Sequence, residues 1–235
     1  PNQSVLLIRS RYIQVFYRVK GHWKLVAYAI LSNLLLSMNA HRYFLVNKPY
    51  HMVSQFVSSH DVRLLGDLNF DFPEGTHAIG RLDQNSEGLL LLTTNKKITK
   101  LLFQGPIPHK RTYLVQVKNE MTNDTARQIA AGMEISAKTG TIFKTTPCEV
   151  KIVQKPVGLF EVGQPLHENA ITTWVTIILT EGKFHQVRKM VAAVHHKCIR
   201  LIRTSIEDIK LGDMQPGEVL EITEQLFFSK LHLNE

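Results

Sequence analysis

The sequence is poor in cysteine and tryptophan, and it lacks the common motifs for metals and nucleotides. Its 235 residues include two cysteines and two tryptophans. Two cysteines cannot form a disulfide framework, so we expect a reducing, cytoplasmic setting. There is no CxxC or HExxH pattern, and the spacing of His185, His195, His196 and Cys198 matches no standard zinc site. A glycine-rich phosphate loop and a dinucleotide fingerprint are also missing, so we expect no metal and no nucleotide cofactor.

The sequence has no apolar run long enough to cross a membrane comfortably, and its beginning has no acidic residues. The apolar run at residues 25–36 follows a basic segment, as in a signal peptide, but it is short and lacks an obvious cleavage site. Residues 1–37 contain five basic residues and no acidic ones, so they supply five of the eight net positive charges. We therefore expect no membrane association. We also expect residues 1–37 to be an N-terminal extension outside the fold, and residues 38–235 to form the folded domain.

The remaining composition is that of a globular protein with a basic region near its end. Hydrophobic residues make up 44% of the chain and charged residues 20%, which is enough for a hydrophobic core. Any single charge run is most often a solvated helix face. Here the basic residues outnumber the only nearby acid, Glu181, six to one, which suits a polyanion such as RNA. The six are Lys183, Arg188, Lys189, Lys197, Arg200 and Arg203.

Hydrophobic periodicity and turn signals predict strands and helices without a strict alternation of the two. We expect strands at 42–47, 77–80, 88–94, 112–118, 171–180, 198–205 and 219–223, with one or two more within 141–154. We expect helices at 95–103, 122–131 and 183–195, a helical turn near 62–68 and a helical C-terminal tail. Residues 155–170 form a Pro/Gly-rich loop that is long enough to be functional. This mixture predicts an α+β fold with a largely antiparallel sheet.

Asp83 is the first candidate for chemistry, because it lies in a polar turn between two strand-like segments. The commoner role of such a residue is to bind local backbone N–H groups. Asp83 and Glu87 could also form an acid and base pair like that of a glycosidase. Nothing else in the sequence indicates a sugar site, because the tryptophan platforms that often bind sugars are missing.

Two more candidates have ordinary structural roles as alternatives. Tyr113 lies in an alternating strand, where an aromatic residue is most often part of the core, but a tyrosine can also stack on an unpaired base and assist a proton transfer. Arg188 is offset from the inward face that Val187, Met190 and Val191 would form on the predicted helix. Such an arginine usually faces solvent, but this one could reach a buried carboxylate.

Taken together, five segments resemble the motifs of the pseudouridine synthases, in order and in approximate spacing. The segments are 47–49, 80–95, 111–115, 181–190 and 200–203, and the resemblance runs from about residue 42 to residue 223. The group concerned is RsuA/RluB/RluE/RluF, whose members act on ribosomal RNA. We expect no S4 RNA-binding domain, because the residues before Arg42 are too few for one. The loop at 155–170 looks like that of the RluE type, which lacks this domain and acts on large-subunit RNA.

The resemblance implies a fold, a reaction and a set of site residues. The fold would be a mixed, mostly antiparallel sheet flanked by helices, as two half-sheets that share a central cleft. The reaction would convert a uridine to pseudouridine without a cofactor, with Asp83 essential, Tyr113 stacking on the base and Arg188 pairing with Asp83. Leu82 and Leu201 would shape the pocket. The residues expected to contact RNA are Arg81, Lys48, Lys183, His185, Gln186, Lys189, Arg200 and Arg203.

The resemblance also sets the expected partner and leaves alternatives open. The partner would be 23S ribosomal RNA, and we expect a monomer. Asp83 could attack C1′ of the ribose or deprotonate C2′, and the sequence does not choose between these roles. One competing function is an RNA-binding protein of the same fold that has no catalytic activity. Another is a different glycosyl-bond enzyme that uses Asp83 and Glu87.

Overall fold

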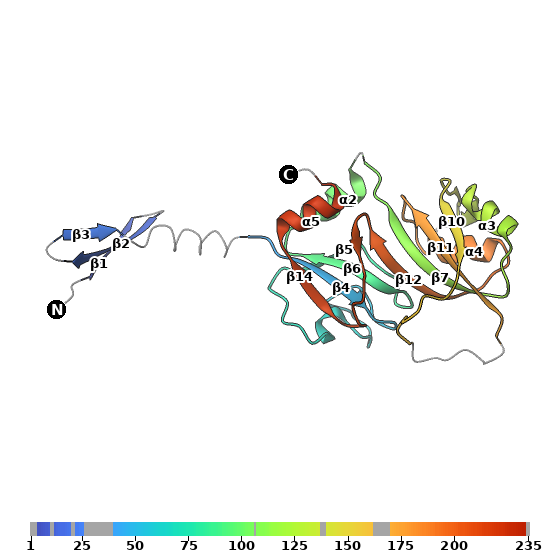
Figure 1. Cartoon of the computed structure of the whole chain (residues 1–235), viewed down its shortest axis with the longest axis horizontal. Coiled ribbons are helices and arrows are strands. Elements are labelled where there is room, and N and C mark those ends of the chain that lie inside the picture. Colours follow the sequence, from blue (N-terminus) through green and yellow to red (C-terminus); the bar gives the residue numbers. More distant parts are fainter. Residues whose placement is uncertain are drawn as a thin grey trace. The chain divides into compact units, whose positions relative to one another are not determined.

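The chain divides into two units in the computed structural model, which describes residues 4–9, 12–19, 22–25, 40–105, 107–136, 140–161 and 170–233. Residues 1–41 mainly contact one another and form the first unit, and residues 42–235 form the second (Figure 1). The first unit contains an antiparallel three-stranded sheet of β1 (Ser4–Arg9), β2 (Tyr12–Val19) and β3 (His22–Leu25), which the sequence analysis did not predict. The apolar run at 26–36 lies outside the described residues. That residues 1–37 are an extension outside the fold stays a prediction.

The second unit is built on one nine-stranded sheet. Its strands are β4 (Tyr43–Lys48), β5 (His77–Ile79), β6 (Glu87–Thr93), β7 (Arg111–Lys118), β10 (Glu149–Val153), β11 (Thr172–Leu179), β12 (Cys198–Ile206), β13 (Ile209–Lys210) and β14 (Val219–Ile222). The order across the sheet is β10-β11-β7-β12-β6-β4-β14, with β13 paired to β12 and β5 paired to β6. Among these strands only β12 and β6 pair in parallel. The predicted α+β fold with a largely antiparallel sheet is therefore confirmed.

The helices cover both faces of this sheet, as Figure 1 shows. They are α2 (Ile98–Gln104), α3 (Asn123–Ala130), α4 (Gln186–Ala193) and α5 (Glu224–Leu231), with a 3-10 turn at Leu65–Asp67. Buried side chains of α2 and α5 share a hydrophobic cluster with Leu89 and Leu91 of β6, and we call this side of the sheet the α5 face. Buried side chains of α3 and α4 pack on β7 and β11, and we call this side the α4 face. None of the helices in the described ranges is both long and apolar enough to cross a bilayer.

Strand β6 shows why the sequence contains a continuous apolar run here. Successive side chains of a strand point to opposite faces of the sheet. Leu89 and Leu91 join the cluster on the α5 face, while Leu90 and Leu92 join a third cluster, around Phe44 of β4, on the other side. Because both faces are covered, all of these leucines are fully buried. The α4 face therefore holds two clusters, one on each side of Tyr113, which packs against both.

The predicted boundaries of α3 agree closely with the structure, whereas α2 and α4 each begin three residues later than predicted. Helix α3 begins after Thr122, whose side chain accepts a hydrogen bond from the Thr125 N–H, and ends before Gly132, which has a φ of +84°. Helix α4 was predicted from residue 183, but its N-cap is His185, which has a left-handed backbone with a φ of +55°. The sequence analysis also missed β8 (Glu134–Ser136), which pairs with β9 (Ile142–Lys144), and it missed β13. Residues 162–169 of the predicted loop lie outside the described residues.

We expect the Gly88→Ala substitution to destabilise the protein, because Gly88 lies where β6 meets β12. A Cβ atom on Gly88 would lie 2.4 Å from the backbone oxygen of Arg203, and the φ of +95° is unfavourable for alanine. The free energy of unfolding, measured by urea denaturation, should fall by about 2–4 kcal/mol. Gly75 is the matched control, because it has a φ of +80° but nothing within 4 Å of its added Cβ. Gly75→Ala should lower stability by only about 1 kcal/mol, and equal losses would contradict the role of this close approach.

Candidate active site

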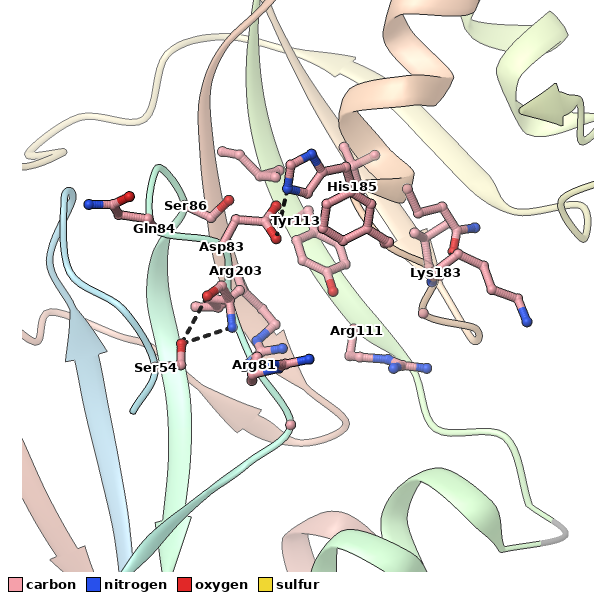
Figure 2. A pocket seen from close by; sticks show the side chains of 18 of the residues that line it. Ser54, Arg81, Asp83, Gln84, Ser86, Arg111, Tyr113, Lys183, His185 and Arg203 are labelled. Atoms are coloured by element: carbon pink, nitrogen blue, oxygen red, sulfur yellow. Dashed lines mark hydrogen bonds and ion pairs between the residues drawn. The ribbon is translucent and has the colours of Figure 1, made fainter. Parts of the chain in front are cut away.

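The candidate site is a cavity of about 660 Å³ on the α4 face of the sheet. Six segments that are distant in the sequence line it: residues 53–55, the loop at 80–86, Phe103 of α2, strand β7, residues 179–187 and strand β12 (Figure 2). Its position follows from the packing, because Tyr113 and Leu201 on one side and Leu82 on the other belong to the two clusters of this face. A cavity of this size can hold a small ligand such as a nucleoside.

Asp83 lies in the loop that connects β5 to β6, and several hydrogen bonds hold this loop. Ser54 fixes Leu82, because the Leu82 N–H donates to Ser54 Oγ at 3.0 Å and the Ser54 hydroxyl donates to the Leu82 carbonyl at 2.9 Å. The Ser86 N–H donates to the Asp83 carbonyl at 2.9 Å. The side chain of Asp83 is 32% exposed and faces the cavity (Figure 2). The carboxylate therefore has a defined position and remains accessible to a ligand.

Two cationic or potentially cationic side chains approach the Asp83 carboxylate from α4 and its start. Arg188 Nε lies 3.9 Å from Oδ2, and His185 Nε2 lies 3.5 Å from Oδ1. Arg188 also anchors the loop, because its Nη2 donates to the Asn85 carbonyl at 2.5 Å and to Ser86 Oγ at 3.3 Å. The left-handed conformation of His185 turns its ring, which stacks on Phe184, toward the carboxylate (Figure 2). Arg188 and Asp83 therefore meet as the sequence predicted.

Tyr113 comes from β7 and lines the cavity opposite Asp83 (Figure 2). It is paired across the sheet with Arg203 of β12. The two predicted wall residues, Leu82 and Leu201, are both buried and both line the cavity. Asp83 and Tyr113 therefore line one cavity and Arg188 lies beside Asp83, and the catalytic roles of these three residues stay predictions. Arg188 reaches Asp83 from behind its loop and is not among the residues that line the cavity.

Two of the predicted RNA contacts were wrong, because their side chains are buried in structural roles. Lys48 is fully buried, and its ammonium donates to the carbonyls of Pro49 at 2.8 Å and Met52 at 2.6 Å. Arg200 is buried on the α5 face, where its guanidinium forms two hydrogen bonds with Glu87, at 2.8 and 2.9 Å. Arg200 therefore points away from the cavity, while its neighbour Leu201 points into it. Charge clustering in the sequence does not distinguish these two faces.

The other predicted RNA contacts fall into a buried group and an accessible group. Gln186 and Arg203 are buried but line the cavity, so they are part of its wall and not of an open RNA-binding surface. Gln186 also holds the segment that precedes α4, because its Oε1 accepts from the Lys183 N–H at 2.9 Å and its Nε2 donates to Glu181 at 2.7 Å. The accessible group consists of Arg81, Lys183, His185 and Lys189.

Sequence reasoning missed Arg111, Ser54 and Glu181 at this site. Arg111 is buried, lines the cavity, and donates from Nη2 to the Thr180 carbonyl at 2.8 Å. The sequence could have indicated Arg111, because it precedes Tyr113 by two residues and residues i and i+2 of a strand share a face. Ser54 exchanges two hydrogen bonds with Leu82, and Glu181 accepts from the Thr146 N–H as well as from Gln186. No local pattern in the sequence indicates the bonds to Leu82 and Thr146.

The glycosidase-like alternative is contradicted by the position of Glu87. This residue is 1% exposed, is bound to Arg200 on the α5 face, and does not line the cavity. It therefore cannot act with Asp83 as an acid and base pair on one substrate. Among the described residues there is also no group of three or more His, Cys, Asp or Glu side chains that could hold a metal ion.

Comparisons with known proteins agree with the resemblance that the motifs indicated. A family described as RNA pseudouridylate synthase matches residues 42–193, a range that contains Asp83, Tyr113 and Arg188. The "Ribosomal large subunit pseudouridine synthase E" of Vibrio vulnificus is 36% identical over 194 residues, which cover 82% of this chain and 80% of that protein. The "Ribosomal small subunit pseudouridine synthase A" of Escherichia coli K12 is 31% identical over 195 residues, which cover 83% and 76%.

Comparison of folds gives the same result. A solved structure described as "Crystal structure of pseudouridylate synthase" superposes on this chain with a TM-score of 0.66 at 27% sequence identity. The superposition covers 82% of this chain and 74% of that structure. Sequence and fold comparisons therefore point to one family, and the resemblance inferred from the five motif segments is confirmed.

The role assigned to Arg200 predicts a large loss of stability in the Arg200→Ala variant. This change leaves the Glu87 carboxylate buried without its partner, so the free energy of unfolding should fall by about 3–5 kcal/mol. Arg42→Ala is the matched control, because Arg42 pairs with Glu221 where the two side chains are 44% and 39% exposed. In the same urea titration, Arg42→Ala should lower the free energy of unfolding by less than about 1 kcal/mol. If the Arg200→Ala protein had normal stability but bound RNA weakly, the original prediction that Arg200 contacts RNA would be correct after all.

The buried position of Lys48 predicts that stability rises with pH above neutrality. Burial lowers the pKa of Lys48 to about 7, although the charges of Glu87 and Asp83 oppose this shift. A lysine in the unfolded chain keeps its proton to about pH 10, so between these values the unfolded state binds more protons than the folded state. The free energy of unfolding should therefore rise by up to about 1.4 kcal/mol per pH unit. Urea titrations at pH 7.5, 8.5 and 9.5 should show this rise in wild type and lose it in Lys48→Met, and equal slopes would refute the assignment.

Proposed function

The chain belongs to the RNA pseudouridylate synthase family, and from this premise we propose that it converts a uridine of 23S ribosomal RNA to pseudouridine. The observation behind the proposal is the partly exposed carboxylate of Asp83, which faces Tyr113 across a cavity and lies beside Arg188 and His185. The large-subunit target is supported by the relatives from Vibrio vulnificus and Xanthomonas campestris, which are described as large-subunit enzymes. Because ribosomal RNA is the substrate, a cytoplasmic location follows.

The reaction breaks the N1–C1′ bond of a uridine, turns the uracil and joins its C5 atom to C1′. The atoms of substrate and product are the same, so the expectation that no cofactor takes part is part of the proposal. A uridine within a stem or a structured loop must be flipped out to reach the cavity, which costs a few kcal/mol of unstacking. The accessible basic side chains of Arg81, Lys183 and Lys189 lie at or beside the cavity and would bind RNA phosphates, which offsets this cost.

In this proposal Asp83 acts on the ribose, either as the nucleophile at C1′ or as the base at C2′. Both roles need negative charge at a fixed position. Arg188 supplies a positive charge 3.9 Å from Oδ2, and its bonds to Asn85 and Ser86 hold the loop in place. Tyr113 lies opposite, where its ring can stack on the flipped uracil and its hydroxyl can take part in removing the C5 proton. The apolar walls of Leu82 and Leu201 would enclose the base.

The decisive variant is Asp83→Asn, which keeps the size of the side chain and removes its charge. We expect pseudouridine formation to be abolished while RNA binding persists, because the accessible basic side chains are unchanged. The measurement is pseudouridine mapping of ribosomal RNA, by carbodiimide modification and primer extension, in cells that lack the protein or carry one variant. One pseudouridine of the large-subunit RNA should be lost without the protein, restored by wild type, and not restored by Asp83→Asn.

The matched control is Asp124→Asn, at a carboxylate on α3 that is 86% exposed and pairs with Arg127. This variant should restore the pseudouridine like wild type. Restoration by Asp83→Asn would rule out the proposed chemistry. An unchanged map in cells without the protein would contradict the large-subunit target and would favour the alternative of an RNA-binding protein without catalytic activity.

A further inference from the structure

Two buried arginines at the cavity have no carboxylate partner, which sets them apart from Arg200. Arg203 and Arg111 are 3% and 8% exposed, and no ion pair is found for either within the described residues. Arg203 Nη2 and Arg111 Nε also have no hydrogen-bond partner and are shielded from solvent. A buried charge is costly unless it is paired, so a fold that keeps two of them needs negative charge nearby at some stage of its function.

Arg203 lies beside Tyr113, and Arg111 borders the same cavity. Arg203 is opposite Tyr113 in the register of β12 and β7, and Arg111 precedes Tyr113 by two residues on the same face of β7. Figure 2 shows the hydroxyl of Tyr113 pointing toward the part of the cavity where both arginines lie, away from Asp83. Burial lowers the pKa of Arg203, the nearby Tyr113 opposes this shift, and the charge of Arg111 adds to it.

Both guanidiniums are also held in place. Arg203 Nε donates to the Leu89 carbonyl at 2.7 Å, and its backbone is fixed against Gly88 of β6. Arg111 donates to the Thr180 carbonyl, and a Cβ atom on Gly182 would lie 3.0 Å from its Nη1. Dipoles and charges that are fixed before a reaction stabilise new charge without the cost of reorientation. The arrangement is therefore suited to one particular atom, the Tyr113 oxygen.

We propose that Arg203, assisted by Arg111, is a positioning residue that aims Tyr113 and stabilises negative charge on its oxygen while Tyr113 removes the C5 proton. This inference rests on the proposed function. In the step, Tyr113 has released its phenolic proton to water beforehand. Its oxygen then takes the proton from C5 after C5 has bonded to C1′. The electron pair of the broken C5–H bond restores the C5–C6 double bond of the uracil, and the pair of the C6–N1 double bond moves to N1, which takes a proton from water.

An RNA phosphate is the other anion that could neutralise these arginines, and the structure favours Tyr113. Arg203 Nη2 and Arg111 Nε are shielded from solvent, so a phosphate in the open part of the cavity does not contact these two atoms, whereas Tyr113 lies opposite Arg203 in the strand pairing. Other charged or titratable side chains face the same cavity and would influence any pH dependence. They are Arg81, Asp83, Glu181, Lys183 and His185.

The test compares the full-length wild type with Arg203→Met and Arg203→Lys on large-subunit ribosomal RNA. We expect Arg203→Met to lower kcat by about 100-fold at pH 7, as removal of one charge-stabilising donor typically does, and Arg203→Lys by about tenfold. KM and its salt dependence should not change. Slowing of the proton transfer should also enlarge the isotope effect on kcat for RNA that carries deuterium at uridine C5. The rising limb of the kcat profile should move to higher pH in Arg203→Met.

Matched variants separate this role from a structural one. Arg127→Met removes an exposed arginine of α3 and should leave every readout unchanged. In a Tyr113→Phe background, Arg203→Met should cause little further loss of kcat, because the group it serves is already absent. Should Arg203→Met fail to fold, Arg203→Lys gives the same readouts, since a larger isotope effect with wild-type KM is still expected.

The outcomes distinguish this inference from the proposed function. A wild type that releases no C5 hydrogen from RNA would overturn both. An active wild type whose Arg203 variants show raised KM, a weaker salt dependence and an unchanged isotope effect would identify the anion as an RNA phosphate and overturn only the inference. Full additivity of Arg203→Met with Tyr113→Phe would also overturn it, because the two side chains would then act independently.

Discussion

The parallel contact between β6 and β12 is the constraint on which the rest of the site depends. It is a short pairing of Ile202 with Glu87 and of Arg203 with Gly88, and it joins β4, β5, β6 and β14 to β7, β10, β11 and β12. The Asp83 loop leads directly into β6, whereas Tyr113 and Arg203 belong to the other group of strands. The two sides of the cavity therefore face each other only because these two strands meet. Gly88 permits the close approach, and the buried pair of Glu87 and Arg200 spans it on the opposite face.

Buried positive charge is used in two different ways around this contact. Arg200 is neutralised by Glu87, and Lys48 is bound by backbone carbonyls, so each holds segments together. Arg111 and Arg203 lie on the cavity side and bind one carbonyl each, without an acidic partner within the described residues. Replacing a buried pair by apolar residues is often neutral for stability, so pairing alone does not explain why charges are buried. The unpaired arginines border the space where the reaction would occur, which is a functional reason to keep them.

The sequence predicted those features that depend on local patterns. The run of leucines in β6 indicated a strand covered on both faces, and Thr122 and Gly132 marked the two ends of α3. It failed where a distant segment decides the outcome. Helix α4 begins late because His185 adopts a left-handed backbone, a conformation that is too uncommon, even for histidine, to be predicted from the residue type alone. Arg200 and Arg203 belong to one basic cluster in the sequence, but they have different surroundings because the sheet separates them into two faces.

The resemblance to the family's motifs predicted that segments distant in the sequence share one site, and this was the only source of that prediction. Spacing along the chain could not show that Asp83 and Tyr113 line one cavity with Arg188 beside Asp83, since that requires the order of strands in the sheet. Because side chains alternate along β7, the position of Tyr113 at the site could have indicated that Arg111 lies on the same face. The sequence could not have shown that Arg111 lacks a nearby carboxylate. The lack of a charged partner for a buried arginine is a property of the assembled fold, and in our proposal it distinguishes Arg203 from the structural Arg200.

The loop that contains Asp83 is fixed from three directions, and this has a consequence for substrate binding. Ser54 holds Leu82, Arg188 holds Asn85 and Ser86, and the Lys48 ammonium lies 3.5 Å from the Gln84 carbonyl. A carboxylate held in this way loses little freedom when a ligand arrives, so the cost of ordering falls on the RNA and on the exposed side chains of Arg81 and Lys183. The rigid interior would set the geometry of the reaction, and the accessible basic residues would determine which RNA can present a uridine to it.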